Sequence, residues 1–320
     1  MIQEEIVNFG EGGILAGVFT PMEKNASCQR QCIILLNAGM IHKIGPNRIY
    51  KKQAEALSKM GYSCFRFDFS GIGDSGFSNS EIGSTSRQIC EVVMAMNWLQ
   101  ENKGLNQFIL SGICSGADIA WRTSLEDERV RGLCLIDGIY SNDVILNNIW
   151  AIANRNLKIR YYKKHMFSLT RWTKLLSGKS GLFNIRNLVM VWQFFSRAVR
   201  KIVLSRRDKQ HNSELNEEVV INDNMASDIN LWNHIFNRGV KVQLIFCEGG
   251  NAIDVYKLTL ADHLKRYEAN TMLHRIFVKD VDHTFTPVWS QHRLIHLISI
   301  WLKEEFKEED LIEKKAGAVA

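Results

Sequence analysis

The chain has 320 residues, of which 46% are hydrophobic and 23% charged, and its formal net charge is +6. This ordinary globular composition excludes a disordered or fibrous protein, and the length suits one large α/β domain with an insertion. The seven cysteines lie mostly inside apolar runs, which indicates reduced thiols, and their spacing does not indicate a zinc site. Without a basic leader or an apolar span of membrane length, the chain is expected to be a soluble cytoplasmic protein.

The first elements expected in chain order form a hairpin over residues 2–19, with its turn at residues 10–13. Strands then alternate with helices, which predicts a mostly parallel, doubly wound sheet. The predicted strands cover residues 32–36, 63–67, 107–110, 132–136, 240–246 and 274–278. The predicted helices cover residues 48–60, 85–102, 117–125, 227–238, 255–267 and 292–306. Residues 141–223 show helical periodicity alone, which predicts a helical cap inserted into a core formed by residues 1–140 and 224–320.

A glycine-flanked cysteine follows the predicted strand at residues 107–110. Gly112, Cys114 and Gly116 form a G-x-C-x-G pattern in which cysteine replaces the serine of a nucleophile elbow. The elbow places its central residue in a strained turn, and the small residues let the backbones approach. A thiol attacks as the thiolate, which the N-terminus of the following helix favours. Cys114 is therefore the predicted nucleophile, and a buried cysteine in a glycine-rich turn is the alternative.

The predicted base is His283, which lies in the loop after the last predicted strand, at the place that the nucleophile–acid–base order of this motif gives to histidine. A surface loop histidine is the alternative. The oxyanion of an acyl-transfer intermediate needs two backbone N–H donors. Ser115, directly after the nucleophile, and Met40, in the turn after the first core strand, are predicted to supply them.

The acid that orients this histidine is less sharply defined by the sequence. It is expected just after the strand at residues 240–246, where Asp254 is the first choice, with Glu248 and Asn251 as alternatives. Asp137, at the end of the strand at residues 132–136, is a further alternative, because it could reach the same histidine from a neighbouring strand.

Two cationic side chains follow the predicted oxyanion turn. His42 and Arg48 are candidates for binding a substrate carboxylate or phosphate, since arginine contacts either group through two donors. Alternatively, Arg48 pairs with Asp68 or Asp74 and pins two loops together. No metal site and no cofactor are expected from these residues.

Three segments carry a family resemblance: residues 37–48, residues 66–75 with the sequence Arg-Phe-Asp-Phe-Ser-Gly-Ile-Gly-Asp-Ser, and the elbow at residues 112–116. They resemble bacterial α/β-hydrolases related to the exosortase-associated hydrolases, over about residues 30–140 and at the His283 loop. The resemblance implies an α/β-hydrolase fold whose inserted cap covers the active site; such relatives often occur with biosynthetic clusters, and some use cysteine at the elbow. Relatives tend to have an aspartate at about Gly250, so this chain departs from them at the acid. Dienelactone hydrolases also place cysteine in this elbow, although their other motifs fit less well.

The predicted cap is strongly basic. Between residues 151 and 210, a single acid, Asp208, stands against fifteen lysines and arginines, at positions 155, 158, 160, 163, 164, 171, 174, 179, 186, 197, 200, 201, 206, 207 and 209. One interpretation of this run is a basic surface exposed to solvent. The alternative is a surface that binds an acidic acyl or peptidyl carrier protein, the phosphates of coenzyme A or anionic lipid. No nucleic-acid-binding motif accompanies the charge.

A cysteine nucleophile exchanges one thioester for another of similar energy, so the first functional hypothesis is an acyl-thioester hydrolase or acyltransferase. It would act, through an acyl-enzyme on Cys114, on acyl groups bound to a carrier protein or coenzyme A in specialised, polyketide- or peptide-type metabolism. The alternatives are a carboxylic ester or lactone hydrolase and a catalytically silent hydrolase-fold binding protein. The acyl chain, the acceptor and a homodimeric state are left open by the sequence.

Overall fold

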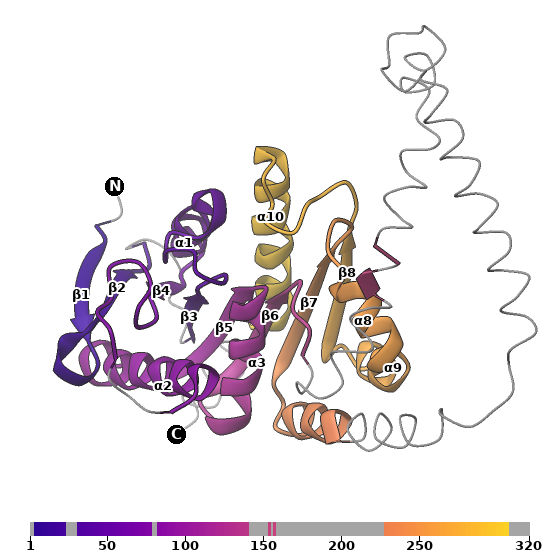
Figure 1. Cartoon of the computed structure of the whole chain (residues 1–320), viewed down its shortest axis with the longest axis horizontal. Helices are drawn as coiled ribbons and strands as arrows, with labels where there is room; N and C mark the ends of the chain where they lie inside the picture. Colours follow the sequence, from indigo (N-terminus) through magenta and orange to yellow (C-terminus); the bar gives the residue numbers. More distant parts are fainter. Residues whose placement is uncertain are drawn as a thin grey trace, which may run out of the picture.

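The computed structural model describes residues 3–23, 31–78, 82–140, 153–154, 156–157 and 227–306. Its centre is an eight-stranded sheet in the order β1-β2-β4-β3-β5-β6-β7-β8 (Figure 1). The strands are β1 (Glu5–Phe9), β2 (Leu15–Thr20), β3 (Gln31–Leu36), β4 (Ser63–Phe67), β5 (Gln107–Ile113), β6 (Val130–Ile136), β7 (Lys241–Cys247) and β8 (Leu273–Val278). Pairing is antiparallel between β1 and β2 and between β2 and β4, and parallel from β4 through β3 to β8. The predicted hairpin and mostly parallel sheet are confirmed.

Helices lie on both faces of this sheet (Figure 1). They are α1 (Ile49–Lys59), α2 (Ser84–Lys103), α3 (Ser115–Glu126), a helix at residues 227–237, α8 (Ala252–Thr259), α9 (Ala261–Ala269) and α10 (Val288–Glu305). The prediction of a single helix over residues 255–267 is wrong, because two helices, α8 and α9, cover this segment. Leu260 has φ −115° and interrupts the helical path, so that α8 ends before it and α9 begins after it.

Alternate strand residues supply two hydrophobic cores. On β3, Ile33 and Leu35 pack with side chains of α1 and α10, whereas Cys32, Ile34 and Leu36 pack with side chains of α2 and α3. Successive side chains of a strand point to opposite faces, so a strand covered on both sides is apolar throughout. This burial explains the continuous apolar runs that predicted the central strands.

The predicted cap at residues 141–223 lies outside the described residues, apart from residues 153–154 and 156–157. Its helical structure, its basic residues and the domain boundaries therefore stay predictions. Among the helices that the structure describes, none combines the length and the apolar character that crossing a bilayer requires.

Candidate active site

The cysteine lies in a sharp turn between β5 and α3. Cys114 has φ 58° and ψ −125°, a conformation that costs energy for a residue with a side chain, and its N–H donates to the carbonyl of Ile136 at 2.8 Å. A Cβ on Gly112 would lie 2.3 Å from the carbonyl carbon of Gly116, and one on Gly116 would lie 2.5 Å from the carbonyl oxygen of Asn37. Glycine is therefore required on both sides of the turn, which has the geometry of a nucleophile elbow.

A histidine and a buried carboxylate complete the arrangement around this cysteine. The Nδ1 atom of His283 lies 2.7 Å from the Oδ2 atom of Asp137, which is 1% exposed. The second oxygen of Asp137 accepts a hydrogen bond from the N–H of Cys247 at 3.2 Å. With Nδ1 bonded to the carboxylate, Nε2 is the ring nitrogen available to the thiol. Cys114, His283 and Asp137 thus form a linked chain of side chains.

The imidazole of this chain is unusually basic. Its hydrogen bond with Asp137, followed by its hydrogen bond with Cys114, outweighs burial and raises the pKa of His283 to about 10. A histidine with this pKa is protonated at neutral pH, and an imidazolium stabilises a neighbouring thiolate. The structure therefore places a cationic imidazole beside the thiol of Cys114.

The acid differs from the first choice made from the sequence. Asp137, at the end of β6, holds the His283 ring, whereas Asp254 lies in the first turn of α8. The other two alternatives contact other groups: Glu248 accepts from the N–H of Asp280 at 2.7 Å, and Asn251 donates to Asn154 at 2.9 Å.

The reason for the different acid lies in the β7 loop. A Cβ on Gly250 would lie 2.0 Å from Oδ2 of Asp137, so the carboxylate from β6 fills the space beside this glycine. The resemblance put an aspartate at about this position in relatives. In this chain the carboxylate reaches the same space from the neighbouring strand.

The loop that carries His283 is held by Asp282, the residue before it, which was not predicted from the sequence. The carboxylate of Asp282 accepts from the hydroxyls of Thr284 and Thr286 at 2.8 and 2.7 Å and from the N–H of Thr286 at 2.8 Å. Aspartate side chains that bond to backbone two to four residues onward shape tight loops. The spacing D-H-T-x-T was the signal that could have identified this role.

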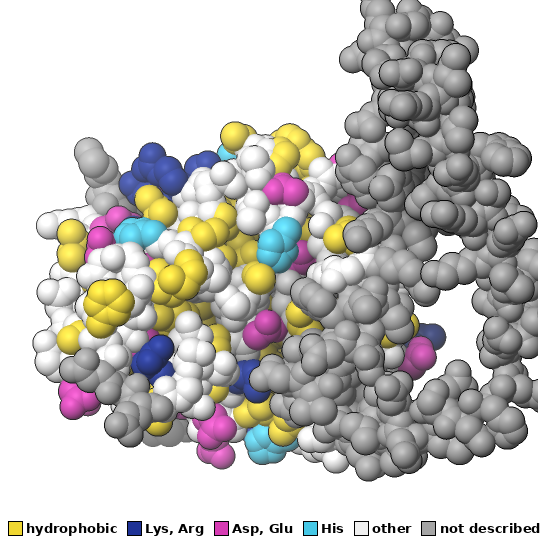
Figure 2. All heavy atoms as spheres, viewed as in Figure 1, with side chains coloured by type: hydrophobic (Ala, Val, Ile, Leu, Met, Phe, Trp, Pro, Cys, Tyr) yellow, Lys and Arg dark blue, Asp and Glu magenta, His cyan; other side chains and the backbone are white. Residues whose placement is uncertain are grey.

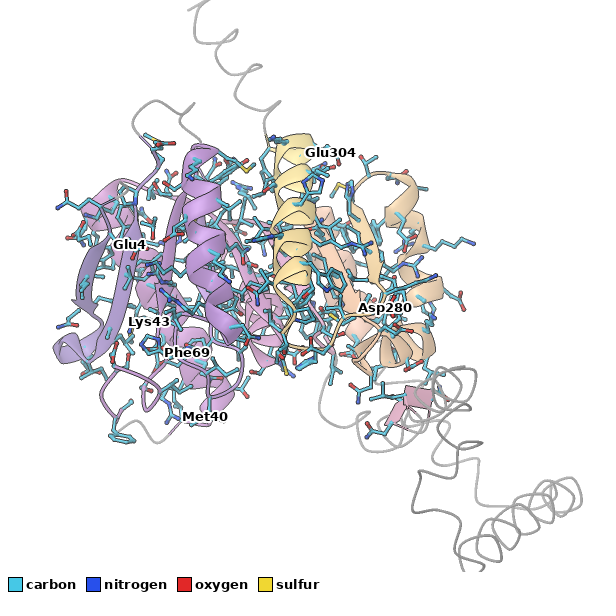
Figure 3. The ribbon with its side chains drawn as sticks, turned by 90° about the horizontal axis from the view of Figure 1, so that it is seen from above. Glu4, Met40, Lys43, Phe69, Asp280 and Glu304 are labelled. Carbon is cyan, nitrogen blue, oxygen red and sulfur yellow. The ribbon has the colours of Figure 1, made fainter. Side chains whose placement is uncertain are left out.

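The two predicted oxyanion donors belong to segments that lie against each other. The N–H of Gly39 donates to Oγ of Ser115 at 2.9 Å, and the N–H of Ile41 donates to the carbonyl of Ala38 at 3.1 Å, which closes a tight turn. Figure 3 shows Met40 on a loop at the edge of the molecule, with Lys43 and Phe69 farther inside. Among the hydrogen bonds within the described residues, none engages the N–H of Met40 or of Ser115. The role of these two amides as oxyanion donors stays a prediction.

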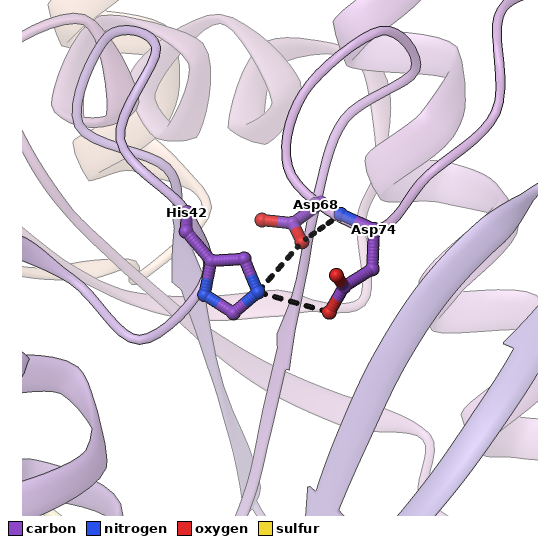
Figure 4. A group of neighbouring side chains, drawn as sticks. All are labelled: His42, Asp68 and Asp74. Carbon is purple, nitrogen blue, oxygen red and sulfur yellow. Dashed lines mark hydrogen bonds and ion pairs between the residues drawn. The ribbon is translucent and has the colours of Figure 1, made fainter.

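Next to this turn, His42 belongs to a charged cluster with Lys43, Asp68 and Asp74. Figure 4 shows the histidine and the two carboxylates of this cluster. Nε2 of His42 lies 3.0 Å from Asp74 and 3.4 Å from Asp68, and its Nδ1 accepts from the N–H of Ile44 at 3.2 Å. Hydrogen bonds from His42 and then Lys43 lower the pKa of Asp74 to about 2.

These pairs change the sequence-based interpretation of two residues. His42 is paired with two carboxylates, and its role in binding a substrate anion stays a prediction. The expected pairing of Arg48 with Asp68 or Asp74 is wrong, because Lys43 supplies the cation, at 2.8 and 2.6 Å from these carboxylates. Arg48 is exposed, and its φ of 62° turns the chain at the start of α1.

The ligand atoms of His42, Asp68 and Asp74 lie within 4.8 Å of one another, a spacing that a metal ion could use. The Lys43 ammonium, however, lies 3.1 Å from Nε2 of His42 and bonds both carboxylates. A metal ion would have to displace this cation. The donor set therefore fits an internal ion pair better than a metal site.

Comparisons with known proteins agree with this architecture. Residues 33–179 match a model of the alpha/beta hydrolase fold family, whereas no curated protein matches the sequence significantly. An esterase from Pyrococcus furiosus aligns over 95% of this chain and 92% of its own, with 16% identity and a TM-score of 0.55. A dienelactone hydrolase from Anabaena variabilis aligns over 95% of this chain and 99% of its own, with 12% identity and a TM-score of 0.53.

An alpha/beta hydrolase from Penicillium sp. aligns over 96% of this chain and 100% of its own, with 15% identity and a TM-score of 0.51. Identities this low establish the fold alone. The narrower resemblance to exosortase-associated hydrolases stays a prediction. The strand order, the turn between β5 and α3 and these matches together establish that the chain has the α/β-hydrolase fold.

Proposed function

We propose that this protein is a carboxylic ester hydrolase that works through an acyl-enzyme on Cys114. The observation that carries the proposal is the linked chain from Cys114 through His283 to Asp137, with the His283 Nδ1 to Asp137 Oδ2 distance of 2.7 Å. A nucleophile, a base hydrogen-bonded to it and a third group that orients the base define covalent acyl transfer. The esterase and the dienelactone hydrolase among the similar folds are in keeping with this choice.

In the first step, the thiolate of Cys114 attacks the carbonyl carbon of the ester. The carbonyl oxygen becomes an oxyanion, which the N–H groups of Met40 and Ser115 stabilise. The C–O bond to the alcohol then breaks, and the leaving alkoxide takes the proton from Nε2 of His283. The products of this step are the free alcohol, a neutral imidazole and a thioester on Cys114.

In the second step, water attacks the thioester. Nε2 of His283 takes a proton from the water as the new C–O bond forms, and the C–S bond breaks to return the thiolate. The carboxylic acid leaves, and the thiolate–imidazolium pair is restored. Asp137 stabilises the imidazolium in the resting state and keeps Nε2 facing the reaction in both steps.

Exposed apolar side chains favour an apolar ester. Met40, Phe77 and Trp289 are 79%, 85% and 50% exposed, and they follow β3, β4 and β8, respectively. The carboxyl ends of parallel strands meet at one edge of the sheet, which is the edge where β5 ends at Cys114. On the face of the core that Figure 2 shows, hydrophobic side chains lie exposed at several places among polar ones. We therefore expect esters with aliphatic or aromatic acyl groups to be preferred over charged ones.

An acyl-thioester hydrolase or acyltransferase is the second candidate, favoured by the run of fifteen basic residues between positions 151 and 210. Such a run suits an acidic carrier protein or coenzyme A. The same cysteine chemistry serves both candidates, and only the acyl donor differs.

The experiment is a comparison of kcat/KM for an uncharged butyrate ester, butyryl-coenzyme A and a butyryl carrier protein, with Cys114→Ala as the control. The proposal expects turnover of the free ester that the variant lacks. If the two thioesters are hydrolysed and the free ester is not, the result would support the second candidate. Failure of all three substrates, together with slow alkylation of Cys114, would contradict both and favour the silent binding protein.

A further inference from the structure

Asp68 is a fully buried carboxylate that the mechanism does not use. It follows β4 and accepts four hydrogen bonds at 2.5 to 3.0 Å, from the N–H and Nζ of Lys43, from Nδ2 of Asn37 and from the N–H of Asp74. Three of the four donors come from the segment at residues 37–43, which contains Met40. The carboxylate is therefore bonded to both ends of the loop that presents a proposed oxyanion donor.

The backbone around this carboxylate leaves little freedom. Nδ2 of Asn37 also donates to the carbonyl of Ile41 at 2.7 Å, and Oδ1 of Asn37 accepts from the N–H of Phe69 at 3.1 Å. A Cβ on Gly73 would lie 2.2 Å from Oδ2 of Asp68, so the loop after β4 closes directly over the carboxylate. Hydrogen bonds to a buried charge are stronger than neutral ones, and their loss is correspondingly costly.

The same loop is tied to the elbow from its other side. Gly39 donates to Oγ of Ser115 at 2.9 Å, and Gly116 packs against the carbonyl of Asn37 with no room for a side chain. The position of the Met40 amide relative to Cys114 thus depends on two supports, the elbow helix and Asp68. Preorganised donors stabilise an oxyanion only when they are held where the charge develops.

We infer that Asp68 is the positioning residue of the oxyanion hole, because its four accepted hydrogen bonds fix the loop that aims the Met40 amide at the Cys114 site. This inference rests on the proposed function. It adds that catalysis requires a carboxylate that touches neither substrate nor nucleophile. His42 and Asp74 form the exposed side of the same ion-pair cluster (Figure 4).

The test separates oxyanion stabilisation from thiolate formation. Acylation by 4-nitrophenyl butyrate passes through an oxyanion, whereas alkylation by iodoacetamide occurs at a saturated carbon and needs only the thiolate. In Asp68→Asn, the amide cannot accept all four hydrogen bonds. We expect kcat for the ester to fall by about 10²-fold, the loss typical of one missing oxyanion donor, while KM and the alkylation rate of Cys114 change by less than about threefold.

The matched control is Asp74→Asn, which removes a carboxylate from the exposed side of the cluster and leaves Asp68 in place. We expect its kcat to stay within about threefold of the parent. An equal fall in ester turnover and alkylation for Asp68→Asn would assign Asp68 a purely structural role, and an unchanged kcat would refute the inference. A parent protein that does not hydrolyse the ester would refute the proposed function instead. Failure of the proposed function and failure of this inference are therefore distinguishable.

Asp68→Asn leaves the buried Lys43 ammonium without one of its carboxylates, which could unfold the chain. The double variant Asp68→Asn with Lys43→Met removes both buried charges and is measured alongside it. If the inference holds, the double variant folds cooperatively and keeps the selective loss of kcat. Recovery of full ester turnover in the double variant would refute the inference, because the carboxylate would then be unnecessary.

Discussion

Replacing Asp137 by asparagine is the sharpest test of the assignment of the acid. The hydrogen bond to Asp137 is the largest contribution to the raised pKa of His283, which stands at about 10 against an ordinary 6.5. The imidazole is 39% exposed, so solvent screens part of this interaction. Asparagine keeps a hydrogen-bond acceptor but loses the charge, so we expect the pKa of His283 to fall in Asp137→Asn by at least about one pH unit, the usual spread of histidine pKa values in folded proteins.

The assay is the pH dependence of kcat/KM for an alkyl ester, followed by acid release. An alkoxide leaves poorly unless the imidazolium protonates it, so activity declines at high pH as His283 loses its proton. In Asp137→Asn this alkaline limb should move to lower pH by at least about one unit, with a rate loss of up to about 10²–10⁴-fold at the optimum.

Asp254→Asn is the matched control, because Asp254 was the acid first expected from the sequence. Its alkaline limb should coincide with that of the parent protein. The reasoning is refuted if Asp137→Asn keeps the parent limb, and still more clearly if Asp254→Asn is the variant that shifts it.

Three further predictions follow from the same geometry. Cys114 should react with iodoacetamide much faster than the exposed Cys90, and this difference in rate should disappear in His283→Gln. Equal alkylation rates for the two cysteines in the parent protein would contradict an activated thiol. Because the pKa of His283 is raised in the folded state, its contribution to stability is full below pH 6.5 and is lost as the pH rises through about 10. The free energies of unfolding in urea of the parent protein and His283→Gln should therefore differ most near pH 6. A difference that increases with pH would contradict this prediction. In Gly250→Ala, the added Cβ would lie 2.0 Å from Oδ2 of Asp137 and should displace this carboxylate from His283. The alkaline limb of the pH profile should then move to lower pH, as in Asp137→Asn. An unchanged profile would show that other atoms move to make room for the Cβ.

The parts of the fold that the sequence predicts are those encoded by local pattern. Buried strands such as β3 read as apolar runs because both of their faces are covered, and Gly112 and Gly116 identify the elbow because no larger residue fits there. The division of the helix at residues 255–267 escaped prediction, since no glycine or proline marks the change at Leu260.

The parts of the site that the sequence leaves open depend on contacts between distant segments. Asp137 and His283 are 146 residues apart, and their pairing is set by the order of β6, β7 and β8 in the sheet together with the missing side chain at Gly250. Similarly, the sequence offers Arg48 as a partner of Asp68 or Asp74, but Arg48 is exposed in the structure and Lys43 bonds both carboxylates.

Intact-protein mass spectrometry of the protein mixed with 4-nitrophenyl butyrate, quenched in acid within the first turnovers, tests the central claim most directly. We predict a single added butyryl group on the peptide that contains Cys114. This group forms as fast as nitrophenolate is released, and it is absent in Cys114→Ala. Ester turnover that persists in Cys114→Ala, or butyryl groups found only on other residues, would contradict an acyl-enzyme on Cys114.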